Sequence, residues 1–286
     1  MSQFASIGLI TKPDASQVID TLRTVHQHLL EQGIQVYLEE RNAELVKNAQ
    51  SLSREQMGQR CDLAIVIGGD GTLLGAARSL AEYDIPIVGI NLGNLGFLVD
   101  VPASDHLSHL DQILAGAYIE ESRFLLQACV KRSEETFCQG LAMNDVVVHI
   151  KNVVRMVEFE TYINGQFVNR QRADGLIVST PSGSTAYALS GGGPILHPSL
   201  ECITLLPICP HTLSSRPIVV AADSLVEICI SEMRFESTHV VYDGQEGCDL
   251  QPDDRIVIQK SPYPVRLLHP KDYDYYHILR EKLNWG

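Results

Sequence analysis

The sequence predicts an α/β, Rossmann-like N-terminal domain and an all-β, sandwich-like C-terminal domain, with the C-terminal helix returning to the first domain. Two observations predict this division. Up to about residue 118, short apolar runs alternate with amphipathic segments, as in parallel strands joined by helical crossovers. From about residue 120, short β-type segments follow one another between turn residues. We therefore expect domains at 1–118 and 119–265, followed by a helical segment at 266–286 that packs back on the first domain.

The N-terminal domain is expected to contain strands separated by helical segments. Apolar residues at helical spacing, from Val18 to Leu29, predict an amphipathic helix that ends at Gly33. The apolar runs between the helices are rich in β-branched residues, which favours buried strands. In chain order the expected elements are a strand at 6–11, a helix at 14–33, a strand at 34–39, a helical segment at 43–60, a strand at 63–69, a helix at 73–81 and a strand at 85–91.

The C-terminal domain is expected to consist of short strands, because turn residues interrupt its apolar runs and helical stretches are few. The β-type segments lie at residues 123–132, 136–150, 154–165, 166–180, 215–230 and 237–245. Helical character returns near the C-terminus, where Tyr276, Leu279 and Leu283 lie on one side of a helix at 271–285.

Composition and charge limit the class of protein. A hydrophobic fraction of 45% and a charged fraction of 20% are typical of a globular chain, and no apolar stretch reaches the roughly 18 residues that a membrane span needs. The first residues lack the basic and apolar regions of a signal peptide, so we expect a cytoplasmic protein. A formal net charge of −13 disfavours a nucleic acid or an anionic membrane as partner, because both require clustered Lys and Arg.

The cysteines are scattered along the chain and form no C-x-x-C pair. This pattern argues against a disulfide framework and a zinc site, and it predicts reduced, mostly buried thiols. The seven residues are Cys61, Cys129, Cys138, Cys202, Cys209, Cys229 and Cys248.

A glycine-rich turn carries the first candidate site. The strand at 63–69 meets three glycines within four positions just before a helix, as in loops that bind phosphate through backbone N–H groups. The Walker A motif and the kinase motifs H-R-D and D-F-G are absent, and G-x-G-x-x-G fails because Leu74 occupies its last position. Asp70, between two of the glycines, can hold a magnesium ion, accept a proton from an attacking hydroxyl, or simply occupy a tight turn.

Two further segments concentrate polar residues. Asn144 and Asp145 lie just before an apolar strand, where they can bind a sugar or an amide or form a turn. The segment at 173–198 combines Asp174, a hydrophobic strand and a three-glycine turn with small hydroxyl residues, which suits the close approach of a nucleotide. The hydroxyl residues are Ser179, Thr180, Ser182, Ser184 and Thr185.

Several segments resemble a known enzyme family. GGDGTLL, from Gly68 to Leu74, is similar to the phosphate-site motif of NAD kinases, of diacylglycerol and sphingosine kinases and, more distantly, of phosphofructokinases. Five further segments resemble the NAD kinase family specifically, in the order NLGNLGFL, LAMNDVVVH, ADGLIVSTPSGSTAYALSGGGPILHP, PHTLSSRP and YDGQ. The resemblance extends from about residue 6 to HPKDY near the C-terminus, which is nearly the whole chain.

The resemblance implies an enzyme that uses ATP, with Mg²⁺ or another divalent cation, to phosphorylate the 2′-hydroxyl of the adenosine ribose of NAD. It implies that Asp70 is the base for that hydroxyl and that N–H groups of Gly69, Gly71 and Thr72 hold phosphate oxygens. It also implies an active site in the crevice between the two domains and a homodimer or homotetramer. The residues that it implies for binding NAD include Asn144, Asp145, Asp174, Thr185, Ala186, Tyr187, Ala188, Leu189, Ser190 and Gln245.

Two arginines and two histidines carry less specific signals. Arg155 and Arg172 lie in β-type segments, where an arginine usually faces solvent, but by resemblance both lie near the bound dinucleotide. In the family, a side chain larger than Gly at the position of Arg172 is associated with preference for NAD over NADH and for ATP over polyphosphate. His197 and His211 are expected to be turn or core residues, and the sequence predicts no resident metal site.

Two other functions fit part of the pattern. A lipid kinase shares G-G-D-G-T but needs an apolar or basic surface to reach a membrane, which the net charge of −13 disfavours. A non-catalytic dinucleotide sensor would use the same pocket, but binding alone does not require Asp70. We therefore predict a kinase.

Overall fold

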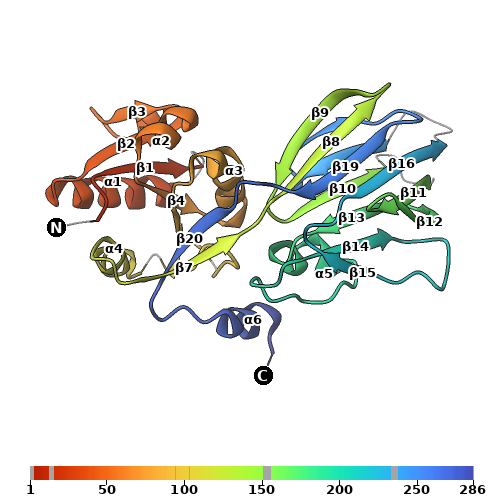
Figure 1. Cartoon of the computed structure of the whole chain (residues 1–286). Helices are drawn as coiled ribbons and strands as arrows, with labels where there is room; N and C mark the ends of the chain where they lie inside the picture. Colours follow the sequence, from red (N-terminus) through yellow and green to blue (C-terminus); the bar gives the residue numbers. More distant parts are fainter. Residues whose placement is uncertain are drawn as a thin grey trace. The chain divides into compact units, whose positions relative to one another are not determined.

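The computed structural model describes residues 3–12, 16–93, 95–102, 104–150, 156–232 and 238–285. The chain forms two units (Figure 1). Unit 1 comprises Met1–Ser122 and Tyr263–Gly286, and unit 2 comprises Arg123–Pro262. Unit 1 therefore contains both the N-terminal and the C-terminal segment of the chain, which agrees with the predicted return of the C-terminal helix. Among the described residues, no helix is long and apolar enough to cross a membrane.

Unit 1 is an α/β layer structure, as predicted. Its eight-stranded sheet has the order β3-β2-β1-β4-β5-β20-β7, with β6 beside β5, and the pairs formed by β1 to β6 are parallel. The strands are β1 (Ser6–Thr11), β2 (Gln35–Glu39), β3 (Gln50–Leu52), β4 (Leu63–Gly68), β5 (Ile87–Asn91), β6 (Val101–Pro102), β7 (Tyr118–Arg123) and β20 (Val265–Pro270). The helices are α1 (Ser16–Glu31), α2 (Arg54–Arg60), α3 (Asp70–Leu80), α4 (His106–Leu114) and α6 (Tyr275–Leu283), with short 3₁₀ helices η1 (Glu40–Leu45) and η2 (Ala81–Tyr83).

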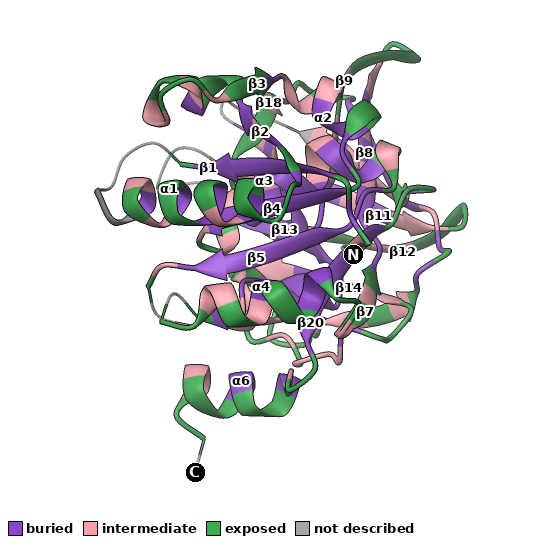
Figure 2. Ribbon diagram, turned by 90° about the vertical axis from the view of Figure 1, so that its left-hand side faces the viewer, coloured by how far each residue is buried: buried purple, intermediate pink, exposed green. Residues whose placement is uncertain are grey.

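The sheet of unit 1 is covered on both faces. Leu22 of α1 and Leu110 of α4 pack in one core cluster with Leu9 and Ile65 of the strands. On the other face α3 approaches the sheet closely, because a Cβ added to Gly89 would lie 3.1 Å from Leu73. Figure 2 shows the central strands buried, whereas the outer faces of α1 and α4 are exposed.

The strand order determines where a ligand can bind. The connection after β1 runs toward β2 and β3, whereas β4 and β5 lie on the other side of β1. In such sheets, ligands bind at the carboxyl ends of the strands where the order reverses, here between β1 and β4. The turn that follows β4 carries Gly69 and Asp70, so the candidate phosphate site lies at this reversal.

Two details of unit 1 differ from the prediction. The segment at 43–60 is not one helix: it contains the end of η1, then β3, then α2, which begins with reciprocal hydrogen bonds between Ser53 and Gln56. Helix α3 begins at Asp70 rather than near Leu73, because a carboxylate in the first turn interacts favourably with the helix dipole.

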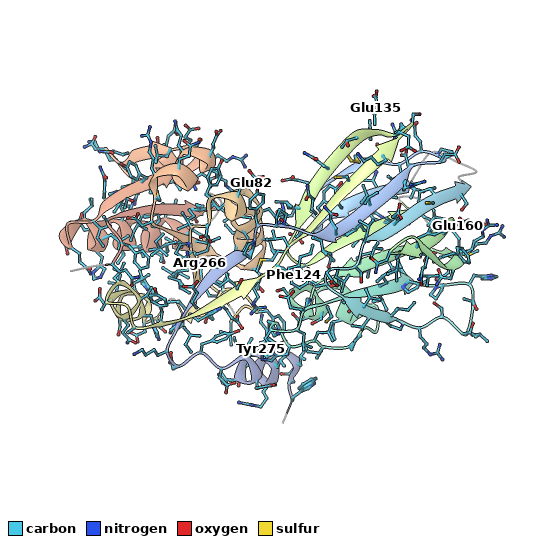
Figure 3. All side chains as sticks on the ribbon, viewed as in Figure 1. Glu82, Phe124, Glu135, Glu160, Arg266 and Tyr275 are labelled. Carbon is cyan, nitrogen blue, oxygen red and sulfur yellow. A yellow bond between two sulfur atoms is a disulfide. The ribbon has the colours of Figure 1, made fainter. Side chains whose placement is uncertain are left out.

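The C-terminal segment contributes a strand to unit 1 as well as the helix. Leu267 of β20 pairs in parallel with Ile87 of β5. Arg266, which lies on the same strand and is labelled in Figure 3, donates hydrogen bonds from Nε and Nη2 to Glu120 of β7 at 2.6 and 3.0 Å. The ion pair and the strand pairing hold the segment at 265–270 in the sheet.

Unit 2 contains two six-stranded sheets, in the orders β15-β14-β13-β10-β17-β18 and β12-β11-β16-β19-β8-β9. Their facing side chains, such as Val146 of β10 and Phe159 of β11, share one core, as the sandwich prediction requires. The strands of unit 2 are β8 (Leu126–Arg132), β9 (Glu135–Ala142), β10 (Asp145–Ile150), β11 (Val157–Ile163), β12 (Gln166–Ala173), β13 (Gly175–Ser179), β14 (Cys202–Ile208), β15 (Ile218–Ala221), β16 (Val226–Glu232), β17 (Thr238–Tyr242), β18 (Glu246–Asp249) and β19 (Arg255–Lys260). Short helices η3 (Ser182–Thr185) and α5 (Tyr187–Ser190) follow β13.

Two predicted β-type segments are each divided between the sheets. The segment at 136–150 forms β9 and β10, and the segment at 166–180 forms β12 and β13. The chain crosses from one sheet to the other at Met143–Asn144 and at Asp174. These crossings bring polar residues to the ends of the strands.

The prediction of reduced, mostly buried thiols was wrong for one pair and partly wrong for the others. Cys138 and Cys248 form a disulfide that joins β9 and β18, which are edge strands of the two sheets. Of the other cysteines that the structure describes, Cys61 is buried and Cys209 is exposed, with the remaining three between these extremes. Lack of a short-range cysteine motif does not exclude a bridge across a sequence separation of 110 residues.

Candidate active site

The GGDG turn places a carboxylate at the start of a helix in unit 1. Gly69 has an extended backbone, with φ −109° and ψ −179°, and precedes the first residue of α3, Asp70. Among the residues that the structure describes, no side chain forms a capping hydrogen bond at this helix end. Because the first N–H groups of a helix have no intrahelical partners, they favour an anion at this position.

The carboxylate of Asp70 is held by a loop that follows β5. Oδ2 accepts a hydrogen bond from the backbone N–H of Phe97 at 2.9 Å. Oδ1 accepts hydrogen bonds from the N–H groups of Leu98 and Val99, both at 3.1 Å. Since each carboxylate oxygen has two lone pairs, these bonds leave Oδ2 with acceptor capacity while they fix the direction of the carboxyl group.

Gly96 makes this arrangement possible. A Cβ added to Gly96 would lie 2.2 Å from Oδ1 of Asp70 and 3.0 Å from the carbonyl oxygen of Val99. A side chain at this position would therefore displace the carboxylate or the loop. The loop is also tied to β5, because the amide of Asn91 donates to the carbonyl of Val99 at 3.1 Å.

The N–H groups that were predicted to hold phosphate do not all have the same environment. The N–H of Thr72 donates to the carbonyl of Gly69 at 3.0 Å, so it is used within the first turn of α3. Gly69 and Gly71 are exposed, and a Cβ added to Gly69 would meet no atom of the described residues within 4 Å. An anion can approach the backbone at Gly69 without steric hindrance.

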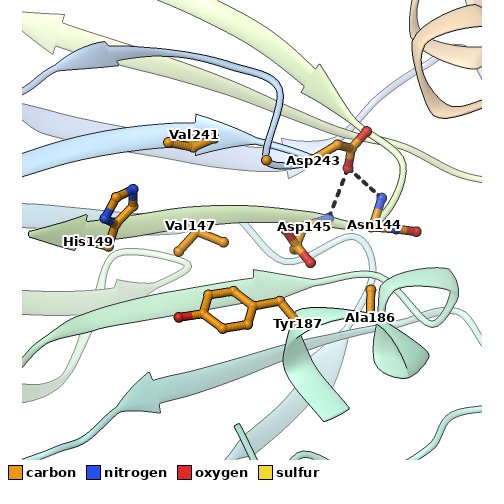
Figure 4. A pocket seen from close by; sticks show the side chains of 9 residues that line it. Asn144, Asp145, Val147, His149, Ala186, Tyr187, Val241 and Asp243 are labelled. Carbon is orange, nitrogen blue, oxygen red and sulfur yellow. Dashed lines mark hydrogen bonds between the residues drawn. The ribbon is translucent and has the colours of Figure 1, made fainter. Parts of the chain in front are cut away.

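Unit 2 contains a pocket of about 270 Å³ beside the start of β10. Four predicted site residues, Asn144, Asp145, Ala186 and Tyr187, line it (Figure 4). The other lining residues were not predicted as site residues; they are Val147, His149, Val241, Asp243 and Gly244. The pocket thus combines apolar walls, a tyrosine ring, an imidazole and two carboxyl groups.

Asp243 holds the start of β10 in place. Its Oδ1 accepts the N–H groups of Asn144 at 2.8 Å and Asp145 at 3.2 Å, and its Oδ2 accepts the N–H of Met143 at 3.0 Å (Figure 4). In return, the N–H of Asp243 donates to the carbonyl of Asp145 at 3.0 Å. The signal in the sequence was the Asp-Gly pair of YDGQ, which is typical of a turn.

Asp145 has an unusual proton affinity. Burial, and secondly the charge of Asp243, raise the pKa of Asp145 from 3.8 to about 7. At neutral pH the carboxyl group is therefore protonated in part of the molecules, where it can donate a hydrogen bond, and ionised in the others, where it only accepts. Its neighbour Asn144 has a side-chain oxygen that is buried and has no hydrogen-bond partner among the described residues. Both groups are suited to bind hydroxyl groups of a sugar.

The ring of Tyr187 forms one wall of the pocket and is 47% exposed. In Figure 4 it lies beside Val147 of β10. An exposed aromatic ring next to aliphatic side chains can stack on a planar heterocycle. The pocket therefore has the chemistry to bind a nucleoside.

Most hydroxyl residues of the loop at 179–185 donate to backbone carbonyls of unit 2. The hydroxyl of Thr180 donates to the carbonyl of Met143 at 2.6 Å, and that of Ser179 donates to the carbonyl of Asn144 at 3.2 Å. A Cβ added to Gly183 would lie 2.2 Å from the same Asn144 oxygen. The loop thus holds the crossing between β9 and β10. Ser184 and Thr185 also donate to backbone carbonyls, and Ser182 accepts from Arg123.

Several predicted residues lie away from the pocket lining in the part of the chain that the structure describes. Arg172 projects from β12 of the other sheet, where its Nε donates to Glu158 at 2.6 Å. Ala188 is buried in a small core with Leu206, so only its backbone can reach a ligand. Arg155 lies outside the described residues. Asp174, Thr185, Leu189, Ser190 and Gln245 are partly or fully exposed in unit 2 but do not line the pocket.

The described residues contain no group of three or more His, Cys, Asp or Glu side chains arranged to hold a metal ion. Mg²⁺ usually retains several waters and binds substrate phosphates.

Comparison with known proteins identifies relatives along the whole chain. Residues 7–118 match the ATP-NAD kinase N-terminal domain, and residues 143–270 match the ATP-NAD kinase C-terminal domain. The chain is 50% identical over 288 residues to the NAD kinase of Pseudomonas putida (strain GB-1), and 49% identical over 288 residues to that of Hahella chejuensis (strain KCTC 2396). Each alignment covers 100% of this chain and 97% of the relative.

Two solved structures are similar to the chain. An NAD kinase from Archaeoglobus fulgidus, in complex with ATP, has a TM-score of 0.78 at 26% identity, covering 98% of this chain and 100% of that chain. The yeast NADH kinase complexed with NADH has a TM-score of 0.90 at 24% identity, covering 98% of this chain and 88% of that chain. The yeast protein shares the fold.

Proposed function

The chain belongs to the NAD kinase family, and from this premise we infer that it transfers a phosphoryl group from ATP to the 2′-hydroxyl of the adenosine ribose of NAD. The products are NADP and ADP. The observation that carries this inference is the 50% identity to a curated NAD kinase over the full length of the chain. Both domains of the family are matched, so the substrate-binding and phosphate-binding halves are both present.

NAD binds in the pocket of unit 2 in this proposal. The carboxyl group of Asp145 and the side-chain oxygen of Asn144 accept hydrogen bonds from sugar hydroxyls, and Tyr187 stacks on a heterocyclic ring. What supports these roles is the unpartnered oxygen of Asn144, the exposed ring of Tyr187 and the shape of the pocket. Asp243 acts indirectly, by fixing the backbone that carries Asn144 and Asp145.

Asp70 takes the proton of the 2′-hydroxyl as that oxygen attacks the terminal phosphorus of ATP. The support for this role is geometric, because three backbone N–H groups fix the carboxylate while Oδ2 retains a lone pair. A well-placed base contributes roughly 10²–10⁴ in rate. The remaining stabilisation comes from donors that neutralise the charge on the phosphoryl oxygens.

The phosphates of ATP bind at the start of α3, and the divalent cation enters with them as part of the substrate. Gly69 supports this placement, because it is exposed and leaves the helix terminus accessible. Mg²⁺ bound to the phosphates neutralises charge as the phosphoryl group is transferred. The overall charge of −13 repels a nucleotide, so this local neutralisation is necessary for binding.

The proposal extends to assembly and compartment. The chain works as a homodimer or homotetramer, supported by the edge strands β12 and β15, which carry exposed Phe167 and Val219. Sedimentation velocity of the purified protein tests this. The proposed compartment is the cytoplasm, where ATP and NAD are both available, and cell fractionation tests that.

A product assay separates this function from its competitors. The purified chain is incubated with ATP, Mg²⁺ and NAD, and nucleotides are separated by chromatography. We expect one ADP for each NADP formed, with NAD preferred to NADH and ATP preferred to polyphosphate. Binding of NAD without any NADP would indicate a dinucleotide sensor. Phosphorylation of diacylglycerol in place of NAD would indicate a lipid kinase.

A further inference from the structure

A buried histidine stands at the point where the C-terminal segment meets the site of unit 1. His269, near the end of β20, is only 1% exposed. Its Nδ1 lies 2.9 Å from Oδ2 of Asp100, and its Nε2 lies 3.3 Å from Oε2 of Glu121. The ring of Tyr273 stacks on the imidazole with centroids 4.0 Å apart. His269 therefore joins β20, β7 and the residues that follow β5.

Two acidic side chains favour the protonated form of this imidazole. Burial alone would lower the pKa of His269, but the hydrogen bonds and charges of Asp100 and Glu121 outweigh burial and raise the pKa. The buried contact between His269 and Asp100 is difficult to break, because loss of the imidazole leaves the carboxylate of Asp100 uncompensated in a poorly solvated place. Asp100 is thus anchored strongly, and its Oδ1 is buried without a partner in the part of the chain that the structure describes.

Asp100 directly follows the residues that hold the proposed base. The N–H groups of Phe97, Leu98 and Val99 all donate to the carboxylate of Asp70. A continuous path of short contacts thus leads from His269 through Asp100 and the 97–99 backbone to Asp70. All of these residues belong to unit 1.

A second contact supports the same loop from the C-terminal segment. The Nζ of Lys282 on α6 lies over the ring of Phe97, 5.9 Å from its centroid. The helix α6 thus contacts Phe97, the first of the three residues that donate to Asp70, and the strand β20 contacts Asp100, which follows the last of them. The chain returns to unit 1 with residues that reach the loop, and not only with an apolar helix face.

We propose that His269 is a positioning residue for the phosphoryl transfer, which acts by anchoring Asp100 and thereby holding the 97–99 backbone against the carboxylate of Asp70. The inference rests on the proposed function, in which Asp70 is the base. His269 itself touches no substrate in this proposal. Its loss lets the loop move and the carboxylate lose its fixed direction, and a displacement of about 1 Å can reduce a rate by about 10²-fold.

A double-mutant cycle tests the proposal with the full-length protein. Four forms are compared: wild type, His269→Gln, Asp70→Asn, and the double variant. We expect His269→Gln to lower kcat by about 10-fold to 100-fold, with less than about threefold change in KM for NAD. If His269 acts through Asp70, the double variant has nearly the same kcat as Asp70→Asn alone, because the two effects are not additive.

Matched variants separate positioning from a general loss of stability. His109→Gln is the control, since His109 also lies near two carboxylates, Asp105 and Asp272, but neither adjoins the loop. It is expected to leave kcat unchanged. If His269→Gln does not fold, Asp100→Asn tests the same path and is expected to show the same selective loss of kcat. Thermal unfolding gives the folded fraction of each variant, and kcat is then calculated per folded molecule.

Each outcome has a distinct meaning. Independent, multiplying effects of His269→Gln and Asp70→Asn, or an unchanged kcat in both His269→Gln and Asp100→Asn, would overturn the positioning role. An unchanged kcat in Asp70→Asn would instead overturn the proposed role of Asp70 as the base. A rise in KM for NAD with normal kcat would also contradict the proposal, because it would place the effect of His269 on NAD binding.

Discussion

The carboxylate of Asp243 accepts the backbone N–H of Asn144 at 2.8 Å, although 99 positions separate the two residues in the chain. The same carboxylate accepts the N–H groups of Met143 and Asp145. A single side chain thus fixes the crossing from β9 to β10, where the pocket residues begin. In unit 1, Asp70 binds three consecutive N–H groups in the same manner.

Asp243→Ala should therefore weaken NAD binding without removing any group that is proposed to contact NAD. The variant leaves three backbone N–H groups without their acceptor, which costs about 2–4 kcal/mol of stability and loosens Asn144 and Asp145. We expect the dissociation constant for NAD to rise by about tenfold or more. Titration calorimetry and urea unfolding measure the two effects. Asp223→Ala, at an exposed position, is the control and should change neither quantity.

Asp70→Asn should abolish most of the turnover. Asparagine retains one oxygen that can accept from the loop, but its NH₂ group cannot take a proton from a hydroxyl. We expect kcat to fall by at least about 10², with a modest change in the dissociation constant for NAD, because a base acts mainly in the transition state. Asp20→Asn, an exposed carboxylate on α1, is the control. Near-normal turnover of Asp70→Asn would remove Asp70 from its proposed role.

Gly96→Ala should have a similar effect without any change to Asp70 itself. The added Cβ would lie 2.2 Å from Oδ1 of Asp70, so the carboxylate or the loop must move. We expect kcat to fall by about 10-fold to 100-fold. The matched control is Gly93→Ala in the same loop, where the nearest atom to an added Cβ is 4.0 Å away. Steady-state kinetics with NAD and ATP would contradict the proposal if both glycine variants behaved like wild type.

The sequence was sufficient for features that depend on local pattern. The strands β1, β4 and β5 were predicted within about two residues, because each is a buried apolar run bounded by turn residues. The placement of Asn144 and Tyr187 in one pocket followed from motifs, through the family resemblance, and not from spacing. The local pattern gave a wrong prediction for residues 43–60, which form the end of η1, then β3 and α2 in place of one helix, because tertiary contacts override helix propensity.

Features that depend on partners distant in the chain could not be predicted from the sequence. Asp243 was not predicted as a site residue, because its three hydrogen-bond donors lie about a hundred positions away. The partners of the Ser179 and Thr180 hydroxyls could not be predicted either, because they are backbone carbonyls that only the folded sandwich brings to them. In each case, the chemistry of the residue was evident and its partner was not.

The pKa of Asp145 predicts a specific dependence of stability on pH. Its value of about 7 in the folded chain is above the ordinary 3.8, so the folded state binds the proton more tightly than the unfolded state. The stability that protonation of Asp145 contributes is therefore fully present below about pH 4 and is lost as the pH rises through about 7. Over this range the folded state should lose up to about 4 kcal/mol of stability through Asp145.

Asp145→Asn removes this titration and provides the test. The free energy of unfolding of the variant, relative to wild type, should increase as the pH is raised from 5 to 8. Urea unfolding at several pH values measures the difference, and Asp223→Asn is the control at an exposed site. A parallel pH dependence for Asp145→Asn and wild type would show that Asp145 titrates normally in the folded protein.

The disulfide between Cys138 and Cys248 should stabilise unit 2. It joins the edge strands β9 and β18 across a sequence separation of 110 residues, so it restricts the unfolded chain considerably. Loops of this length correspond to about 2–5 kcal/mol. We expect the double variant Cys138→Ser, Cys248→Ser to lose stability of this size in urea unfolding, and wild type treated with a dithiol reductant to behave in the same way. Cys209→Ser, at an exposed free cysteine, is the control: it should have the stability of wild type and lose the same amount on reduction. If the reductant has no effect on wild type and alkylation labels both Cys138 and Cys248 before reduction, the bridge does not form in solution.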